Sequence, residues 1–348
     1  MKVGMYYNNK DVRAEEMPVP QIGPGEMLME VKASGICGSD LMEWYRIKKA
    51  PLVLGHEVAG DIIEVGEKVN KYKKGNRVAV THHVPCNTCR FCLSGHHTTC
   101  DTLRSTNFYP GGFAEYLRIP EINVDRGVFL LPDDMSYEDG TFIEPLGTVI
   151  RGQRQANVKP GNSMLVLGCG IAGLLHIKLA RALGAGTIVA TDINEYRMSR
   201  ANRFGAQYVV HANENIPNYI RKVNQGRLVD RVIICTGAVS SVTQALNSID
   251  RGGTVLFFAV PKPDETVPVD FNKLWKDEVT LITSYGASQL DLTQAIELIQ
   301  NGRVVVKDMI THRLSLNEIG MGFKVASSGD KCLKVIIEPN PSPLVGED

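Results

Sequence analysis

Residues 164–173 read Met-Leu-Val-Leu-Gly-Cys-Gly-Ile-Ala-Gly, an apolar run followed by three spaced glycines. The run has the length of a buried strand, and Ile171–Leu183 continues with apolar residues at helical spacing. A Gly-x-Gly-x-x-Gly turn between a strand and a helix is typical of a dinucleotide-binding site. Gly168 would permit the tight turn, Gly170 would let the backbone approach a pyrophosphate, and Gly173 would let helix and strand pack closely.

Strand-like and helix-like segments alternate through the region that follows this turn. The sequence predicts a helix at residues 195–204 and strands at residues 187–191, 229–235, 254–260 and 279–284, with further helical stretches between them. Such alternation is typical of a parallel sheet covered by helices on both faces. We therefore expect residues 149–286 to form a Rossmann-type, doubly wound α/β domain.

Asp192 closes the strand that follows the glycine turn. An acidic side chain at this place accepts hydrogen bonds from the ribose hydroxyls and repels a 2′-phosphate, so the sequence favours NAD over NADP. Arg197 is close enough along the chain to stack on the adenine. The other residues expected at the cofactor lie in the glycine turn or near the carboxyl ends of later strands: Ile171, Ala172, Thr236, Val260 and Tyr285.

The first part of the chain has a different sequence pattern, in which short β-type runs alternate with glycine-rich turns. Strands are predicted at residues 27–31, 58–65 and 77–80, and turn signals recur at residues 23–25, 65–67 and 74–76. We expect residues 1–148 to form an irregular, β-barrel-type domain. A helix at residues 291–300 and a last strand at residues 333–337 belong to a tail, residues 287–348, that we expect to rejoin this domain.

Charge and composition exclude several classes of partner. Lys+Arg and Asp+Glu each number 38, so the formal net charge is zero. A nucleic acid or an anionic membrane would favour a basic face, so we expect neither as a partner. Met1–Lys10 lacks a long apolar core and no apolar run is long enough to span a bilayer, so we expect a cytoplasmic protein.

Four of the eight cysteines are clustered within fifteen positions, as Cys86, Cys89, Cys92 and Cys100. In a reducing compartment this spacing indicates a metal site before disulfides, and four thiolates suit one tetrahedral Zn²⁺ with no open position. An iron–sulfur cluster is the chemical alternative. A closed zinc site would have a structural role. We expect the histidines nearby to be solvated loop residues: His82, His83, His96 and His97.

A second group of possible metal ligands is dispersed along the chain. Cys37 lies in Gly-Ile-Cys-Gly-Ser-Asp (35–40) and His56 in Gly-His-Glu (55–57). A catalytic zinc needs about three protein ligands and one exchangeable position. The third ligand would be a carboxylate, either Glu57 or Glu144 of Phe-Ile-Glu-Pro (142–145). Taken singly none of these residues indicates a metal, and grouping them depends on a family resemblance.

The chain resembles the zinc-containing medium-chain dehydrogenase/reductase family, and within it the sorbitol (polyol) and L-threonine dehydrogenase branch. The motifs that carry the resemblance follow the family's order over essentially the whole chain: Gly-Ile-Cys-Gly-Ser-Asp (35–40), Gly-His-Glu-Val-Ala-Gly (55–60), the cysteine cluster (86–100), Gly-Gly-Phe-Ala-Glu-Tyr (111–116), Glu-Pro-Leu (144–146) and the glycine turn (168–173). The resemblance implies a GroES-like catalytic domain split around a Rossmann domain, two zinc ions per chain, NAD, and a homodimer or homotetramer.

The resemblance also implies roles for single residues. Cys37, His56 and Glu57 match the positions of the catalytic zinc ligands. Glu144 matches a position that binds the metal in some members and holds its water in others, and Ser39 matches the hydroxyl that relays the substrate's proton. The family often has a histidine in the same relay, five residues after the metal-binding cysteine. Here that position is Met42, so the outer proton path departs from the family's.

We expect hydride transfer between NAD and the CH–OH group of a polyol, a sugar alcohol or a related secondary alcohol. L-threonine 3-dehydrogenase and a simple alcohol dehydrogenase are the alternatives among enzymes. A protein that binds dinucleotide and zinc without turnover is the alternative from another class. The joint presence of the catalytic set argues against an inert protein: Cys37, Ser39, His56, Glu57 and Glu144.

Overall fold

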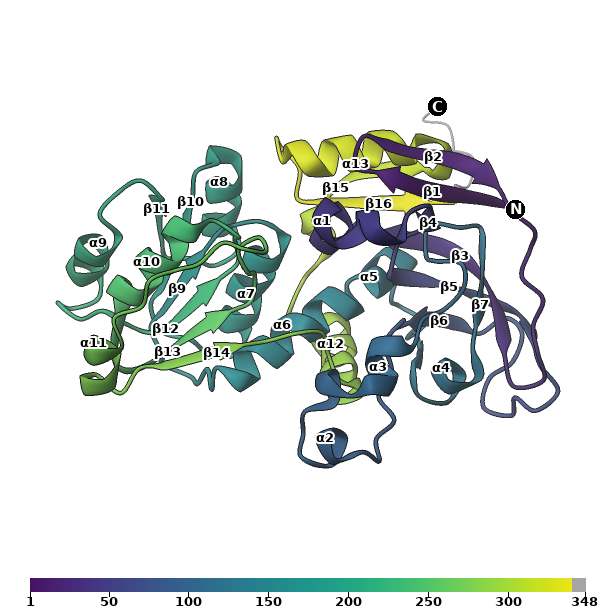
Figure 1. Cartoon of the computed structure of the whole chain (residues 1–348), viewed down its shortest axis with the longest axis horizontal. Coiled ribbons are helices and arrows are strands. Elements are labelled where there is room, and N and C mark those ends of the chain that lie inside the picture. Colours follow the sequence, from purple (N-terminus) through teal and green to yellow (C-terminus); the bar gives the residue numbers. More distant parts are fainter. Residues whose placement is uncertain (340–348) are drawn as a thin grey trace. The chain divides into compact units, whose positions relative to one another are not determined.

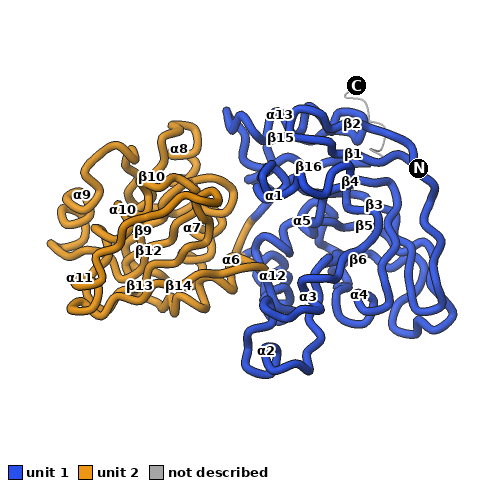
Figure 2. Tube along the Cα trace, in the orientation of Figure 1, with its two compact units in different colours: residues 1–147, 287–302, 306–348 blue, residues 148–286, 303–305 orange. Residues whose placement is uncertain are grey.

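The computed structural model describes residues 1–339, and the chain divides into two compact units. Unit 1 contains residues 1–147, 287–302 and the chain from Val306 onward, and unit 2 contains residues 148–286 and 303–305 (Figure 2). The two units are described separately below. Within the described residues, no helix has both the length and the apolar character needed to cross a membrane.

Unit 2 is built on a six-stranded, fully parallel sheet (Figure 1). Its strand order is β11-β10-β9-β12-β13-β14, in which the sequence order reverses direction at β9. This is the strand order of a Rossmann fold, with its switch point between β9 and β12. The strands are β9 (Met164–Leu167), β10 (Ile188–Asp192), β11 (Tyr208–His211), β12 (Val229–Ile234), β13 (Ile249–Phe257) and β14 (Thr280–Thr283).

Helices connect these strands, as expected for right-handed crossovers between parallel strands. They are α7 (Ile171–Ala182), α8 (Glu195–Arg203), α9 (Ile216–Val223), α10 (Val239–Ser248) and α11 (Phe271–Lys276). Every residue of β9 is buried, which explains why that strand reads as an unbroken apolar run. The α/β fold class predicted from the glycine turn and the strand–helix alternation is confirmed.

Unit 1 is mainly antiparallel. A seven-stranded sheet has the order β15-β16-β3-β5-β6-β8, with β7 also paired to β3, and a smaller sheet has the order β2-β1-β4. The strands are β1 (Lys2–Asn8), β2 (Asp11–Glu16), β3 (Met27–Gly35), β4 (Leu52–Val53), β5 (Glu57–Val65), β6 (Arg77–Val80), β7 (Tyr116–Ile119), β8 (Val128–Leu130), β15 (Ile310–Ser315) and β16 (Lys334–Glu338).

Short helices join the strands of unit 1. The α-helices are α1 (Glu43–Arg46), α2 (Arg90–Leu93), α3 (Asp101–Ser105), α4 (Glu121–Arg126), α5 (Tyr137–Thr141), α12 (Gln289–Gln300) and α13 (Ile319–Ser328). The 3₁₀ turns are η1 (Gly38–Leu41), η2 (Ile47–Lys49), η3 (His97–Thr99), η4 (Lys307–Met309) and η5 (Leu316–Glu318). The C-terminal strand β16 pairs with β3, so the tail joins the sheet formed by the first part of the chain.

Among the elements that differ from the sequence-based expectation, two involve segments with candidate site residues. The strand expected at residues 254–260 begins at Ile249 and ends at Phe257, so Val260 lies beyond it. Helix α6 (Ile143–Gln155) was not predicted, because Pro145 and two glycines interrupt its helical pattern. Pro145 is tolerated because it lies in the first helical turn, where its missing N–H has no carbonyl partner.

Candidate functional site

The strand pairing of unit 1 brings the dispersed metal-ligand candidates together. Cys37 follows the end of β3, and His56 and Glu57 stand at the start of β5. Gly35 and Glu57 are register partners in this antiparallel pair. Side-chain ligand atoms of Cys37, His56 and Glu57 all lie within 4.8 Å of one another. Neighbouring strand ends therefore gather a thiolate, an imidazole and a carboxylate into one group.

Two glycines make room for this group. Gly55 has a φ of +90°, and a Cβ there would come within 2.8 Å of the Phe113 amide nitrogen. A Cβ on Gly35 would collide with the Glu57 carboxylate and with the side chain of Lys334. Both positions therefore require glycine, the first for conformation and the second for space.

Lys334 of β16 forms a buried ion pair with Glu57. Its Nζ contacts Glu57 Oε2 and also donates to the carbonyl oxygen of Ile36 at 3.2 Å. The exposed fractions of the two side chains are 0% for Lys334 and 1% for Glu57. A buried charge is costly without a partner, and Lys334 is the opposite charge that accompanies the Glu57 carboxylate in the interior.

Asp40 is a further buried carboxylate, located one turn after Cys37. Its Oδ2 accepts from the Cys37 amide at 3.0 Å, and its Oδ1 lies 3.4 Å from His56 Nδ1. Burial lowers the pKa of His56, but Asp40 and Cys37 outweigh it and raise that pKa well above its usual value. Asp40 thus fixes the His56 ring, leaving the other ring nitrogen for a metal.

Glu144 lies in the first turn of α6 and is not among the residues that form this group in the described chain. Burial, together with the nearby carboxylates Glu57 and Asp40, raises the pKa of Glu144 to about 7, although His56 and Lys334 act in the opposite direction. Glu144 is therefore close enough to interact electrostatically with the Cys37–His56–Glu57 group and can change protonation near neutral pH.

Ser39 lies in η1 between Cys37 and Asp40. Its amide donates to Cys37 Sγ at 3.4 Å, and its hydroxyl lies 3.5 Å from the same sulfur. Arg46, at the end of α1, donates to the Ser39 hydroxyl at 3.0 Å. Met42 is the residue that joins η1 to α1 and is only partly buried.

The expectation of solvated loop histidines is wrong for His82 and His83. The ring centroid of His82 lies 4.9 Å from that of His56 and 3.7 Å from that of His83. Burial, helped by the neighbouring imidazoles, lowers the pKa of His82 well below its usual value and that of His83 to about 4. His82 therefore packs as a neutral ring against His56, and His83 packs as a neutral ring against His82. His96 is exposed, as expected.

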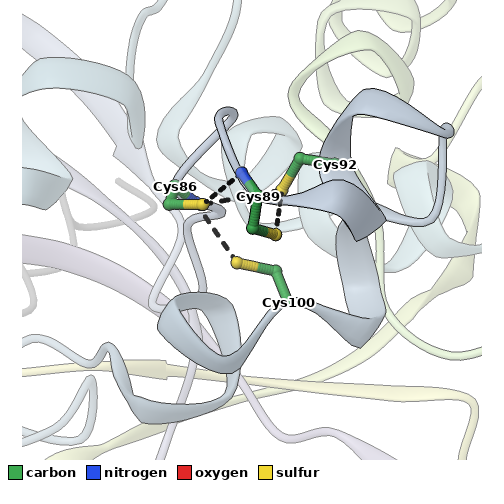
Figure 3. A group of neighbouring side chains, drawn as sticks. All are labelled: Cys86, Cys89, Cys92 and Cys100. Carbon is green, nitrogen blue, oxygen red and sulfur yellow. Dashed lines mark hydrogen bonds between the residues drawn. The ribbon is translucent and has the colours of Figure 1, made fainter.

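The clustered cysteines form the second group of possible metal ligands. Cys86, Cys89, Cys92 and Cys100 point toward one another (Figure 3), and their sulfurs lie within 4.8 Å of each other. The Cys89–Cys92 and Cys86–Cys92 sulfur separations are 3.5 and 4.0 Å. Four sulfurs about 2.3 Å from one zinc ion would be roughly 3.8 Å apart, so the donor set fits a single tetrahedral ion.

The cysteine lobe, residues 86–100, has little apolar core of its own. Its buried cluster contains only Leu103 besides two of the cysteines, Cys92 and Cys100. Backbone amides point at the sulfurs instead: the Cys89 amide donates to Cys86 Sγ at 3.2 Å and the Cys86 amide to Cys100 Sγ at 3.4 Å. The lobe is therefore arranged around the thiols.

In unit 2, the glycine turn has the geometry of a dinucleotide cradle. Gly168 has a φ of +94°, and a Cβ on Gly173 would collide with the carbonyl oxygen of Gly168. By contrast, a Cβ on Gly170 would meet no heavy atom within 4 Å. The protein itself does not need a glycine at position 170, which leaves space for a ligand against the backbone at the N-terminus of α7.

Asp192 ends β10 with its carboxylate already bound to backbone amides. Oδ2 accepts from the Cys169 amide at 2.6 Å, and Oδ1 accepts from Ile193 and Asn194 at 2.8 and 2.9 Å. The side chain thus ties the glycine turn to the next strand. This second role was not foreseen from the sequence.

The remaining cofactor candidates lie at one edge of the sheet. Thr236, Val260 and Tyr285 follow β12, β13 and β14 at their carboxyl ends, and the last two are about half exposed. Ile171 and Ala172 form the first turn of α7, and Arg197 lies in the first turn of α8. In a parallel sheet this edge is where ligands bind.

Comparison with known proteins agrees with this architecture. Family models described as alcohol dehydrogenase GroES-like domain and zinc-binding dehydrogenase match residues 23–133 and 172–301. Sorbitol dehydrogenase from Bacillus subtilis (strain 168) is 32% identical over 353 residues, with 98% of each chain covered. The chain belongs to the zinc-containing medium-chain dehydrogenases. Within that family it falls in the polyol dehydrogenase branch and is an oxidoreductase acting on CH–OH donors.

Two further matches extend the comparison. Sorbitol dehydrogenase from Ovis aries is 31% identical, covering 95% of this chain and 94% of the relative. A crystal structure of a protein assigned as a zinc-binding dehydrogenase from Sinorhizobium meliloti 1021, bound to NADP, is similar with a TM-score of 0.86. It is 28% identical and covers 97% of this chain and 99% of its own.

Sequence reasoning about this dehydrogenase missed three functional neighbours, namely Asp40, Arg46 and Lys334. Asp40 was within the quoted motif, and its place three residues after Cys37 is that of a capping box. Lys334 is a single charge in the apolar run Leu-Lys-Val-Ile-Ile (333–337), a pattern that indicates a buried ion pair. No pattern in the sequence distinguished Arg46.

Proposed function

We propose that this chain oxidises the CH–OH group of a polyol, a sugar alcohol or a related secondary alcohol and passes the hydride to NAD. The observation that carries the proposal is the close group of half-buried Cys37 with buried His56 and Glu57, found in a member of the zinc-containing dehydrogenases. A thiolate, an imidazole and a carboxylate are three of the donors that a catalytic zinc takes, leaving one position for a substrate oxygen.

We assign the catalytic zinc to Cys37, His56 and Glu57, with Glu144 as the nearby carboxylate that holds water or exchanges with Glu57. A zinc ion bound there would supply Lewis acidity that makes the substrate hydroxyl easier to deprotonate. Lys334 limits the charge that Glu57 brings to the site, and Asp40 orients His56. Ser39 is placed to receive the substrate's proton.

We assign a second zinc to Cys86, Cys89, Cys92 and Cys100. All four donors are protein thiols, so an ion held there has no position for a substrate and serves to order the lobe. The sulfur separations of 3.5–4.0 Å favour one ion over an iron–sulfur cluster, whose thiolates bind different iron atoms and so lie farther apart.

For the cofactor we propose NAD, bound along the carboxyl edge of the unit 2 sheet. The Gly170 backbone and the α7 N-terminus would receive the pyrophosphate, and the bound nicotinamide would accept the hydride. Asp192 disfavours a 2′-phosphate because it is buried and anionic. NADP, which the Sinorhizobium meliloti relative binds, is the alternative that the assay must include.

We further propose that the chain acts in the cytoplasm as a homodimer or homotetramer, with neither nucleic acid nor membrane as a partner. Strand β14 is an edge strand of the unit 2 sheet, and its first and last residues are exposed. Phe271 and Trp275 of α11, the helix before it, are 71% and 76% exposed. Unpaired strand edges beside apolar side chains favour association with a second copy.

The deciding experiment is a substrate panel on the purified, zinc-loaded chain. Polyols, sugar alcohols, L-threonine and simple alcohols are each tested with NAD and with NADP, while the zinc content is measured on the same preparation. We expect two zinc ions per chain and the highest kcat/KM for a polyol with NAD. A preparation with two zinc ions that oxidises no polyol, sugar alcohol or other alcohol of the panel with either cofactor would refute the proposal.

A further inference from the structure

Ser39 has a partner that the family's usual proton relay does not include. Arg46 donates from Nη2 to Ser39 Oγ at 3.0 Å and from Nε to the carbonyl oxygen of the same residue, also at 3.0 Å. The guanidinium therefore donates hydrogen bonds to both the hydroxyl and the backbone carbonyl of Ser39. Because its donors form a rigid fork, two such bonds to one residue define the direction of the hydroxyl more closely than one bond would.

Other contacts hold the guanidinium in place. Its Nη2 lies 3.5 Å from Asp40 Oδ1, and its carbon lies 4.7 Å from the centre of the Tyr45 ring. The side chain of Arg46 is 17% exposed, whereas Asp40 is fully buried. Since Asp40 also contacts His56, one short chain of contacts links Arg46 to the proposed zinc ligands.

An arginine cannot do what a relay histidine does. A histidine accepts a proton on one nitrogen and releases one from the other, whereas a guanidinium keeps its charge and can only donate. Met42, at the family's histidine position, carries no exchangeable proton. Arg46 can therefore orient the Ser39 hydroxyl, but neither Arg46 nor Met42 can take a proton from it.

We propose that Arg46 is a positioning residue that takes the place of the relay histidine, and that water receives the proton from Ser39. A hydroxyl has two acceptor lone pairs and one donor hydrogen. Arg46 occupies one lone pair, the substrate hydroxyl transfers its proton to the other, and Ser39 releases its own proton to water. One O–H bond to Ser39 forms as another breaks, and no electrons change hands.

The fixed positive charge also favours this direction of transfer. Negative charge that develops on the Ser39 oxygen as its proton leaves is stabilised by the guanidinium 3.0 Å away. The inference rests on the proposed dehydrogenase function, since it concerns the substrate's proton.

The test compares Arg46→Ala and Arg46→Lys with the unmodified chain. We expect kcat to fall roughly 10- to 100-fold in Arg46→Ala, with KM changed little, and less in Arg46→Lys, which keeps the charge but loses the fork. Added guanidinium ion, at concentrations well below denaturing ones, should restore part of the kcat of Arg46→Ala. Lys48→Gln is the control, because it removes an exposed charge two residues away.

A spectroscopic measurement distinguishes a role of Arg46 in orienting the Ser39 hydroxyl from a role in maintaining the geometry of the metal ligands. With Co²⁺ in place of zinc, the visible absorption bands of the catalytic site should be the same in Arg46→Ala and in the unmodified chain, because Arg46 contacts Ser39 and Asp40 but none of the proposed ligands. Three results would each overturn the assignment: a kcat within twofold of the unmodified chain, a loss that guanidinium does not restore, or changed cobalt bands.

The unmodified chain is assayed first. If it oxidises no alcohol of the panel, the proposed function fails and the role of Arg46 falls with it. If it is active and Arg46→Ala is equally active, only the inference about Arg46 is refuted.

Discussion

The two groups of metal-ligand candidates are built in opposite ways. The cysteine lobe takes all its donors from residues 86–100 and has almost no apolar core around them. The Cys37–His56–Glu57 group takes its donors from the ends of two paired strands, and its balancing charge, Lys334, comes from a third. The first can form locally, whereas the second exists only when the whole sheet of unit 1 is complete.

The two groups also treat negative charge differently. Amide and hydroxyl hydrogen bonds from Thr88, together with the Cys89 amide, lower the pKa of Cys86 to about 5. Burial raises the pKa of Glu144 to about 7 beside the other group. Backbone and side-chain donors in the lobe therefore stabilise the Cys86 thiolate, whereas burial beside the Cys37–His56–Glu57 group penalises the charged form of Glu144. The cysteine lobe thus relies on hydrogen bonds from nearby backbone amides. The Cys37–His56–Glu57 group relies instead on a charged side chain, Lys334, that is distant in sequence.

The largest expected effect concerns the active site alone. Cys37→Ser should lower kcat by roughly 10³-fold or more, because a poor ligand removes the Lewis acid. Zinc content should fall from two ions to one, with NAD binding and thermal stability little changed. Cys332→Ala, a buried cysteine outside both groups, should retain activity. A Cys37→Ser enzyme with near-normal turnover would show that the catalytic group is misassigned.

Lys334→Met tests the group whose parts are distant in sequence, because it removes the partner of Glu57 in the buried ion pair. In the metal-free chain it leaves Glu57 buried and unpaired, which should lower the free energy of unfolding by about 3–5 kcal/mol in urea titrations. Zinc should reduce that loss, since the ion offsets the same carboxylate. Adding Glu57→Gln to the variant should recover part of the stability. Equal stability of Lys334→Met and the unmodified chain would mean that the ion pair does not contribute to the free energy of unfolding.

Cys89→Ser tests the cysteine lobe, whose metal-ligand candidates are close together in sequence. The lobe should lose its metal and the melting temperature should fall by roughly 5–10 °C, because little else orders residues 86–100. The remaining folded enzyme should keep its kcat. Ser94→Ala, in the same lobe but not a metal-ligand candidate, should change neither quantity. A lower kcat per folded chain would connect the lobe to the chemistry.

The smallest effect is a chemical one in the metal-free chain. Since the folded pKa of Cys86 is lowered to about 5, its thiolate is present above that pH, and alkylation should already be fast at neutral pH. Burial raises the pKa of Cys92 to about 12, so this thiol should react slowly. Thr88→Val should shift the Cys86 profile to higher pH, as followed by peptide mass mapping. Equal rates at the two cysteines would contradict the asymmetry.

Regular alternation and local spacing made much of the molecule predictable. The strand at residues 164–167 and the helix beginning at Ile171 fall where the apolar pattern and the glycine turn put them. The cysteine lobe was equally visible because its donors are adjacent in sequence. Helix α6 was missed because Pro145 and glycines hide its periodicity, although tertiary packing overrides those local preferences.

The partners of the active site could not be found in the same way. Arg46 and Lys334 act through geometry that only the folded sheet creates, and one sequence without its relatives gives no measure of which charges meet. His82 and His83 were misjudged for the same reason, since the contacts of His82 with His56 and of His83 with His82 depend on the conformation of the loop after β6. Residue type and spacing predict ligands well, but not what surrounds them.

The Glu57–Lys334 pair has a consequence for the order in which the two proposed metal sites form. Lys334 is synthesised 277 residues after its partner, whereas the cysteine lobe is complete once Cys100 has been added. On the proposed assignment, a nascent chain could bind the zinc of the cysteine lobe early, whereas the Cys37–His56–Glu57 group would be complete only when β16 pairs with β3. A chain released before Lys334 would lack the cation that balances Glu57, so it would not have the complete group that the proposed chemistry requires.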